Sequence, residues 1–128
     1  MPNQIQPLIV KAGGVRIEIE YRHRGSDAGL TFQVYDDKDE MASEVLRFDC
    51  FKKRPHFHYI NSRSRKIERI DKKTAPNPVL WALTRIKTDL QSLVWRAGHR
   101  NFSQQINQPA VASALAKKEK EIIRLAQG

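Results

Sequence analysis

The first half of the chain alternates apolar and polar residues, which is the pattern of half-buried β-strands. In residues 15–24 apolar side chains occupy every second position at first, with charged side chains between them. The strands that this pattern predicts run over about 5–10, 15–24, 30–34, 44–50, 55–59 and 65–71. We therefore expect an antiparallel meander of four to six strands over about residues 5–71, with one face buried.

The second half of the chain has the apolar spacing of helices. Asn77 is a good N-cap residue, and Pro78 suits the first helical turn, where its missing N–H has no helical partner. Beyond them, apolar residues recur at spacings of three and four up to Gly98, which suits a helix end. The expected helices cover about residues 78–97 and 109–125. Strands followed by helices indicate an α+β fold, in which at least one helix packs on the sheet.

Two of the expected strands form a hairpin whose register follows from the sequence. Antiparallel pairing about residues 52–53 places Asp49 opposite His56 and Arg47 opposite His58. The apolar residues then share the other face: Leu46, Phe48, Cys50, Phe57 and Tyr59. A shift of one residue would mix the two faces, so the apolar pattern fixes the register. The polar face therefore gathers one guanidinium, one carboxylate and two imidazole groups, which are the candidate catalytic residues.

Length and composition limit the class of protein. At 128 residues the chain fits one α+β domain, residues 1–128, with one core, and its single cysteine excludes an intramolecular disulfide. No secretion signal opens the chain, and no apolar run approaches the ~18 residues of a membrane span. We expect a soluble cytoplasmic protein with no membrane partner. Residues 101–128 form a helical tail whose thin apolar stripe suits packing on its own domain or formation of a homodimer.

Basic residues are concentrated around the hairpin. Residues 47–73 hold ten Lys/Arg and three Asp/Glu, a net charge of +7 in a chain whose total is +9. Such a field attracts the phosphates of RNA or another anionic partner, although a basic surface also serves only to keep a protein soluble. The residues expected to contact phosphate are Lys52, Lys53, Arg54, Arg63, Arg65 and Lys66. Phe51 is the aromatic residue of the hairpin that is expected to be free to stack on a base.

The polar hairpin residues also suggest a metal site. His56 and His58 are two residues apart on one strand, and Asp49 lies across from them, which would make a set of two histidines and one carboxylate. The hairpin supplies no further ligand, because His23 belongs to a different strand. The sequence therefore predicts no cofactor, and these three residues are the candidate ligands if a metal is bound.

The same side chains suit acid–base chemistry without a metal. Imidazole groups exchange protons near neutral pH and can act as a proton donor and acceptor pair. Asp49 would orient His56 and stabilise its imidazolium form, while Arg47 would hold a phosphate and offset transition-state charge. These are the parts needed to cleave an RNA phosphodiester with the 2′-hydroxyl as nucleophile. The third interpretation is that the polar face of the hairpin is solvated and has only a structural role. The sequence therefore does not decide whether the protein is an enzyme.

The motif Arg47-Phe48-Asp49, the segment 55–59 and the helix start at Asn77-Pro78 with Trp81 resemble those of an uncharacterised bacterial family of small proteins. The resemblance spans most of residues 15–100, and the family lends no function. The hairpin also resembles TumE-type toxins, which join an Arg-aromatic-Asp strand to a Pro-His-rich segment, although Cys50 stands where those toxins have Asn. That resemblance implies a ribonuclease and an antitoxin partner.

These observations combine into one expected function. We expect residues 46–59 to contact RNA or another phosphate-bearing partner. The alternatives are a toxin-like, metal-independent ribonuclease that uses His56 and His58, and a non-catalytic homodimeric interaction protein.

Overall fold

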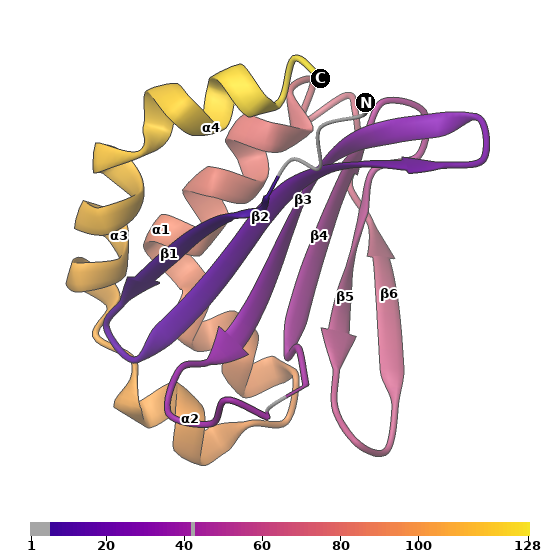
Figure 1. The fold of residues 1–128 in the computed structure, drawn as a ribbon. Helices are drawn as coiled ribbons and strands as arrows, with labels where there is room; N and C mark the ends of the chain where they lie inside the picture. Colours follow the sequence, from indigo (N-terminus) through magenta and orange to yellow (C-terminus); the bar gives the residue numbers. More distant parts are fainter. Residues whose placement is uncertain (1–5, 42) are drawn as a thin grey trace.

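The computed structural model describes residues 6–41 and 43–128, which form a six-stranded antiparallel sheet with helices on one face (Figure 1). The strands lie across the sheet in chain order. They are β1 (Leu8–Ala12), β2 (Val15–Arg24), β3 (Asp27–Asp36), β4 (Leu46–Phe51), β5 (His56–Ile60) and β6 (Arg65–Arg69). The predicted meander is confirmed. Its expected start at residue 5 lies outside the described residues.

The β1–β2 hairpin turns on two glycines. Ala12 pairs with Val15, so the loop holds only Gly13 and Gly14, whose φ angles are 59° and 85°. Two consecutive positive φ values give the type I′ turn, whose twist matches that of the flanking strands. Residues with a Cβ atom adopt such φ values only under strain, which explains the glycine pair.

A third glycine lets two hairpins meet. Gly29 pairs with Arg22 on one side and with Phe51 on the other. A Cβ atom at Gly29 would lie 2.2 Å from the carbonyl oxygen of Cys50, so only glycine allows this approach. The tip of the β2–β3 hairpin can therefore run beside the β4–β5 turn, as the upper part of Figure 1 shows.

Helices cover the apolar face of the sheet. They are α1 (Pro78–Arg96), α2 (Arg100–Gln105), α3 (Gln108–Lys117) and α4 (Glu119–Leu125). The predicted ends of the first helix are confirmed: the Asn77 side chain accepts a hydrogen bond from Leu80 N–H, and Gly98 beyond the helix has a φ of 96°. The Trp81 ring of α1 lies 5.6 Å from that of Phe57, so α1 packs directly on the sheet.

The C-terminal region has more helices than the sequence predicted. The single helix expected over 109–125 is divided into α3 and α4 at Lys118, where φ and ψ are −101° and 4°. The short helix α2 was not expected either. The change of direction at Lys118 brings Ile122 into the core, where it is fully buried.

The apolar stripe of the tail packs within the chain itself. Val111, Leu115 and Ile122 are buried in the same core as the sheet, and α3 contacts both α1 and β1. This packing uses the surface on which the expectation of a homodimer rested. Among the described residues, no helix has the length and apolar character needed to cross a membrane.

Candidate functional site

The hairpin of β4 and β5 has the predicted register. Asp49 pairs with His56, and Arg47 pairs with His58. The apolar residues between them lie in the core on the side of α1. Because side chains alternate along a strand, these four polar side chains project from the opposite face, which we call the polar face. Their predicted placement on one face is confirmed.

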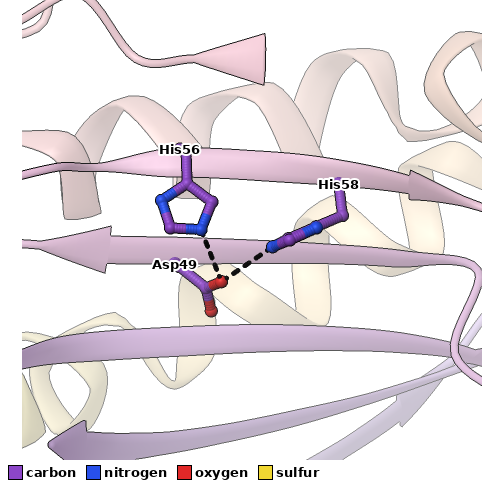
Figure 2. Close-up of side chains that lie close together, drawn as sticks. All are labelled: Asp49, His56 and His58. Carbon is purple, nitrogen blue, oxygen red and sulfur yellow. Dashed lines mark hydrogen bonds and ion pairs between the residues drawn. The ribbon is translucent and has the colours of Figure 1, made fainter. Parts of the chain in front are cut away.

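Asp49 is the centre of this cluster (Figure 2). Its Oδ2 atom lies 3.0 Å from Nε2 of His56 and 3.0 Å from Nε2 of His58. Nε of Arg47 donates to the same oxygen over 3.3 Å. Asp49 and His58 are only 2% and 3% exposed, whereas His56 is partly buried. One carboxylate oxygen therefore connects side chains of both strands beneath the surface.

The hydrogen bonds of His56 determine where its protons lie. Its Nδ1 atom is 2.8 Å from the carbonyl oxygen of Arg54, which can only accept, so Nδ1 carries a proton. Its Nε2 atom faces the carboxylate of Asp49, which is a second acceptor. Two acceptors repel each other at this distance unless a positive centre lies between them. A proton on Nε2, or a cation bound to Nε2, would satisfy this contact.

The ring of His58 makes its polar contacts through one nitrogen. Its Nδ1 atom is buried and has no hydrogen-bond partner among the residues that the structure describes. Its Nε2 atom lies 3.0 Å from Asp49 and 3.3 Å from Nη2 of Arg47. The shorter contact assigns the proton to Nε2, which then donates to the carboxylate. Both histidines therefore turn Nε2 toward the same oxygen.

The surrounding charges keep Asp49 ionised. Burial by itself would raise the pKa of Asp49, but the hydrogen bond from His58 and the charges of Arg47 and His56 hold this pKa below its ordinary value. Arg47 is in turn paired with Glu44 over 3.0 Å. The cluster is thus charge-compensated, and its carboxylate is not a proton donor at neutral pH.

A basic hollow lies at the surface beside His56. It has a volume of about 500 Å³ and is lined by residues of two hairpins: Arg24, Ser26, Asp27, Phe51, Lys53, Arg54 and His56. A smaller hollow of about 150 Å³ shares Arg24 and Phe51 with it and reaches Arg47 and Asp49. The polar cluster therefore borders a surface that an external ligand can enter.

Only one of the two histidines lines the basic hollow. His56 does, whereas His58 lies beneath the surface with its ring against Asp49. A ribonuclease that uses both imidazoles needs both to reach the substrate, and this geometry provides such access for His56 alone. The catalytic roles of Arg47, Asp49, His56 and His58 remain predictions.

The residues predicted to contact phosphate lie in three places. Lys52, Lys53 and Arg54 form the exposed β4–β5 turn, beside the basic hollow. Arg63 and Arg65 lie at the other end of β5, in a hollow whose lining includes several carboxylates. Those acidic residues are Asp36, Asp39 and Glu44. The remaining residue, Lys66, pairs with Tyr59 and lies on the helix side of the sheet.

Three arginines near the cluster were not predicted. Arg22 and Arg24 line the smaller hollow, and Arg69 pairs with His56 from β6. A signal for Arg22 was present, because it occupies an outward position in the alternation of β2. Its position beside the β4–β5 hairpin depends on two registers, that of β2 with β3 and that of β3 with β4. Gly29, which links the two, has no side chain from which either register could be predicted.

The expectation that Phe51 is free to stack on a base is wrong. Phe51 is 4% exposed, and its ring meets the edge of the His56 ring with centroids 5.8 Å apart. The side chain fills the space that its pairing partner Gly29 leaves open under the β2–β3 hairpin. It therefore supports His56 from below and forms part of the floor of the basic hollow.

Comparison with known proteins gives one result. A family model described as Domain of unknown function (DUF7700) matches residues 9–122. No curated protein and no solved structure matches the chain. The match covers the sheet, except for Leu8, and most of the helical region, and its description assigns no activity.

Proposed function

We propose that this chain, which belongs to the family described as Domain of unknown function (DUF7700), binds single-stranded RNA through the basic hollow beside His56. The phosphates would contact Arg24, Lys53 and Arg54, which surround the hollow from two hairpins. Lys52, in the same exposed turn, would extend the contact along the backbone of the RNA. The proposal is for binding, because only one imidazole of the cluster borders this surface.

The observation that carries this proposal is the absence of acidic partners. Among the described residues, no carboxylate lies within 4.0 Å of the side-chain nitrogens of Arg24, Lys53 or Arg54. Arg22 and Arg47, by contrast, are each paired with a glutamate. Unpaired cations gathered around a concave surface attract a polyanion and release counterions when it binds.

The size of the basic hollow is compatible with this ligand. A volume of about 500 Å³ falls within the range of pockets that hold a nucleotide-sized group. A chain of several phosphates is favoured over a single phosphate, because the cations come from separate hairpins and lie along a surface.

The test is the binding of a fluorescently labelled 12-nucleotide single-stranded RNA, followed by anisotropy at several salt concentrations. The double variant Lys53→Ala/Arg54→Ala should bind more weakly than the original protein. Each phosphate contact on a single strand contributes about 0.7 to the slope of log affinity against log salt, so two lost contacts reduce the slope by about 1.4.

A matched control removes two positive charges elsewhere. Lys117 and Lys120 are exposed in the C-terminal helices, and Lys117→Ala/Lys120→Ala has the same net charge as the test variant. This control should keep most of the affinity and the slope. Equal losses in both variants would show that the protein attracts RNA only through its total charge, and an affinity independent of salt would contradict phosphate-led binding.

A further inference from the structure

We infer that Asp49, His56 and His58 form a binding site for one divalent first-row transition-metal ion. The three side chains offer one oxygen and two nitrogen ligands, which all lie within 4.8 Å of one another. His56 also lines the basic hollow, but the proposed contacts with RNA use other side chains of that surface, namely Arg24, Lys52, Lys53 and Arg54. Either proposal can fail without the other.

The distances in the cluster fit a shared ion. Metal–ligand bonds to imidazole nitrogen and carboxylate oxygen are about 2.1 Å long, so two ligands at right angles on one ion lie about 3.0 Å apart. The Asp49 oxygen lies 3.0 Å from each of the two Nε2 atoms. The three ligand atoms lie within 4.8 Å of one another, whereas two ligands on opposite sides of one ion lie about 4.2 Å apart. The imidazole rings would therefore have to turn toward each other to bind one ion, which would leave positions open for water or another ligand.

The hydrogen bonds of His56 prepare its ring for this role. A metal-binding imidazole normally donates its other N–H to a carbonyl or carboxylate, which fixes the tautomer. Nδ1 of His56 donates to the carbonyl oxygen of Arg54 over 2.8 Å. The lone pair of Nε2 is therefore the one that faces Asp49, where an electron-poor centre is required.

Arg47 sets the electrostatic condition for binding. Its guanidinium lies 3.3 Å from Asp49 Oδ2 and 3.3 Å from His58 Nε2. An ion bound to His58 Nε2 has to displace the contact between Arg47 and His58. Glu44, 3.0 Å from Nη1, holds the guanidinium and compensates its charge. Arg47 can then keep its hydrogen bond to the carboxylate from outside the ligand set.

The ligand types decide which metals suit the site. Both imidazoles would bind through the lone pair of Nε2, so each ring would carry its proton on Nδ1 when the ion is bound. Imidazole ligands suit zinc, iron, nickel and copper, whereas magnesium and calcium prefer oxygen ligands. The ion would enter on the side of His56, which is the exposed member of the set.

The test is titration of the chelator-treated, full-length protein with zinc chloride in competition with a chromogenic chelator. We expect one zinc ion per chain, and a cobalt-substituted protein with visible absorption bands. His56→Ala should lower zinc affinity by more than tenfold, because even the loss of an outer partner costs 10–100-fold.

The control is His23→Ala, which removes an exposed histidine outside the ligand set. This variant should bind zinc as the original protein does. Circular dichroism of metal-free His56→Ala would verify its fold. The variant His58→Gln removes the other imidazole ligand and should also lower zinc affinity. Absence of stoichiometric zinc at micromolar concentration, or equal affinity in His56→Ala and His23→Ala, would overturn the inference.

Discussion

The carboxylate of Asp27, at the start of β3, accepts a hydrogen bond from the backbone N–H of Arg54 over 2.9 Å. Its other oxygen accepts one from the N–H of Lys53, also over 2.9 Å. One side chain therefore joins the tips of two hairpins that are 26 residues apart in the chain. The side chains of the basic hollow take their positions from this contact, because both hydrogen-bonded residues belong to its lining.

Replacing Asp27 by Ala should loosen the β4–β5 turn. The loss of two charge-assisted hydrogen bonds at an exposed turn should cost about 1 kcal/mol in the free energy of unfolding. Hydrogen exchange should become faster at the amides of residues 52–54. Unchanged exchange at Lys53 and Arg54 would show that the turn keeps its shape without the carboxylate.

Replacing Asp49 by Asn should destabilise the fold far more. The amide would leave His56 without its negative partner and Arg47 with Glu44 alone, and its NH₂ group cannot accept the hydrogen bonds that the carboxylate accepts. Breaking one side of a buried ion pair typically costs about 3 kcal/mol or more. Urea denaturation measures this loss. Asp89→Asn, which breaks a half-exposed pair with Arg85 on α1, should cost less than about 1 kcal/mol.

The same carboxylate should make stability depend on acid pH. The pKa of Asp49 in the folded protein is held below its ordinary value of 3.8, by its contacts with His58, Arg47 and His56, in spite of burial. Unfolding then takes up a proton, so this stabilisation is fully present above pH 3.8 and is lost as the pH falls through the lower, folded-state pKa. The free energy of unfolding, measured from pH 6 to pH 2.5, should fall less steeply for Asp49→Asn. Parallel curves for the two proteins would contradict this assignment.

The sequence predicted the strand pairing because both faces of the hairpin are chemically distinct. Aromatic residues at 48 and 57 and polar residues at 49 and 56 allow only one register, and the structure has that register. The division of the C-terminal helix at Lys118 could not be predicted, because the residues around it are ordinary helix formers. Only tertiary packing, which draws Ile122 into the core, distinguishes the two helices.

The sequence predicted which residues share the polar face, but it did not predict how deeply they are buried. Alternation shows which face a side chain occupies, and it does not show what covers that face. Here Asp49 and His58 are buried among long polar side chains, including Arg47 and Glu44, whose contacts depend on neighbouring strands and loops. The face that Lys66 occupies could not be predicted, because β6 carries charges on both faces and has no apolar pattern.

The positions of the predicted phosphate-binding residues lead to a final prediction. Arg24 lines the basic hollow, whose lining has one carboxylate, that of Asp27, whereas Arg63 lies at the other end of β5 in a hollow lined by three carboxylates. Both side chains are exposed and carry the same charge, so Arg24→Ala and Arg63→Ala change the net charge equally. Because phosphates are repelled by nearby carboxylates, Arg24→Ala should weaken RNA binding and lower the salt slope by about 0.7. Arg63→Ala should leave both close to their original values in the same anisotropy titration. The reverse order would place the RNA at the β5–β6 end of the sheet.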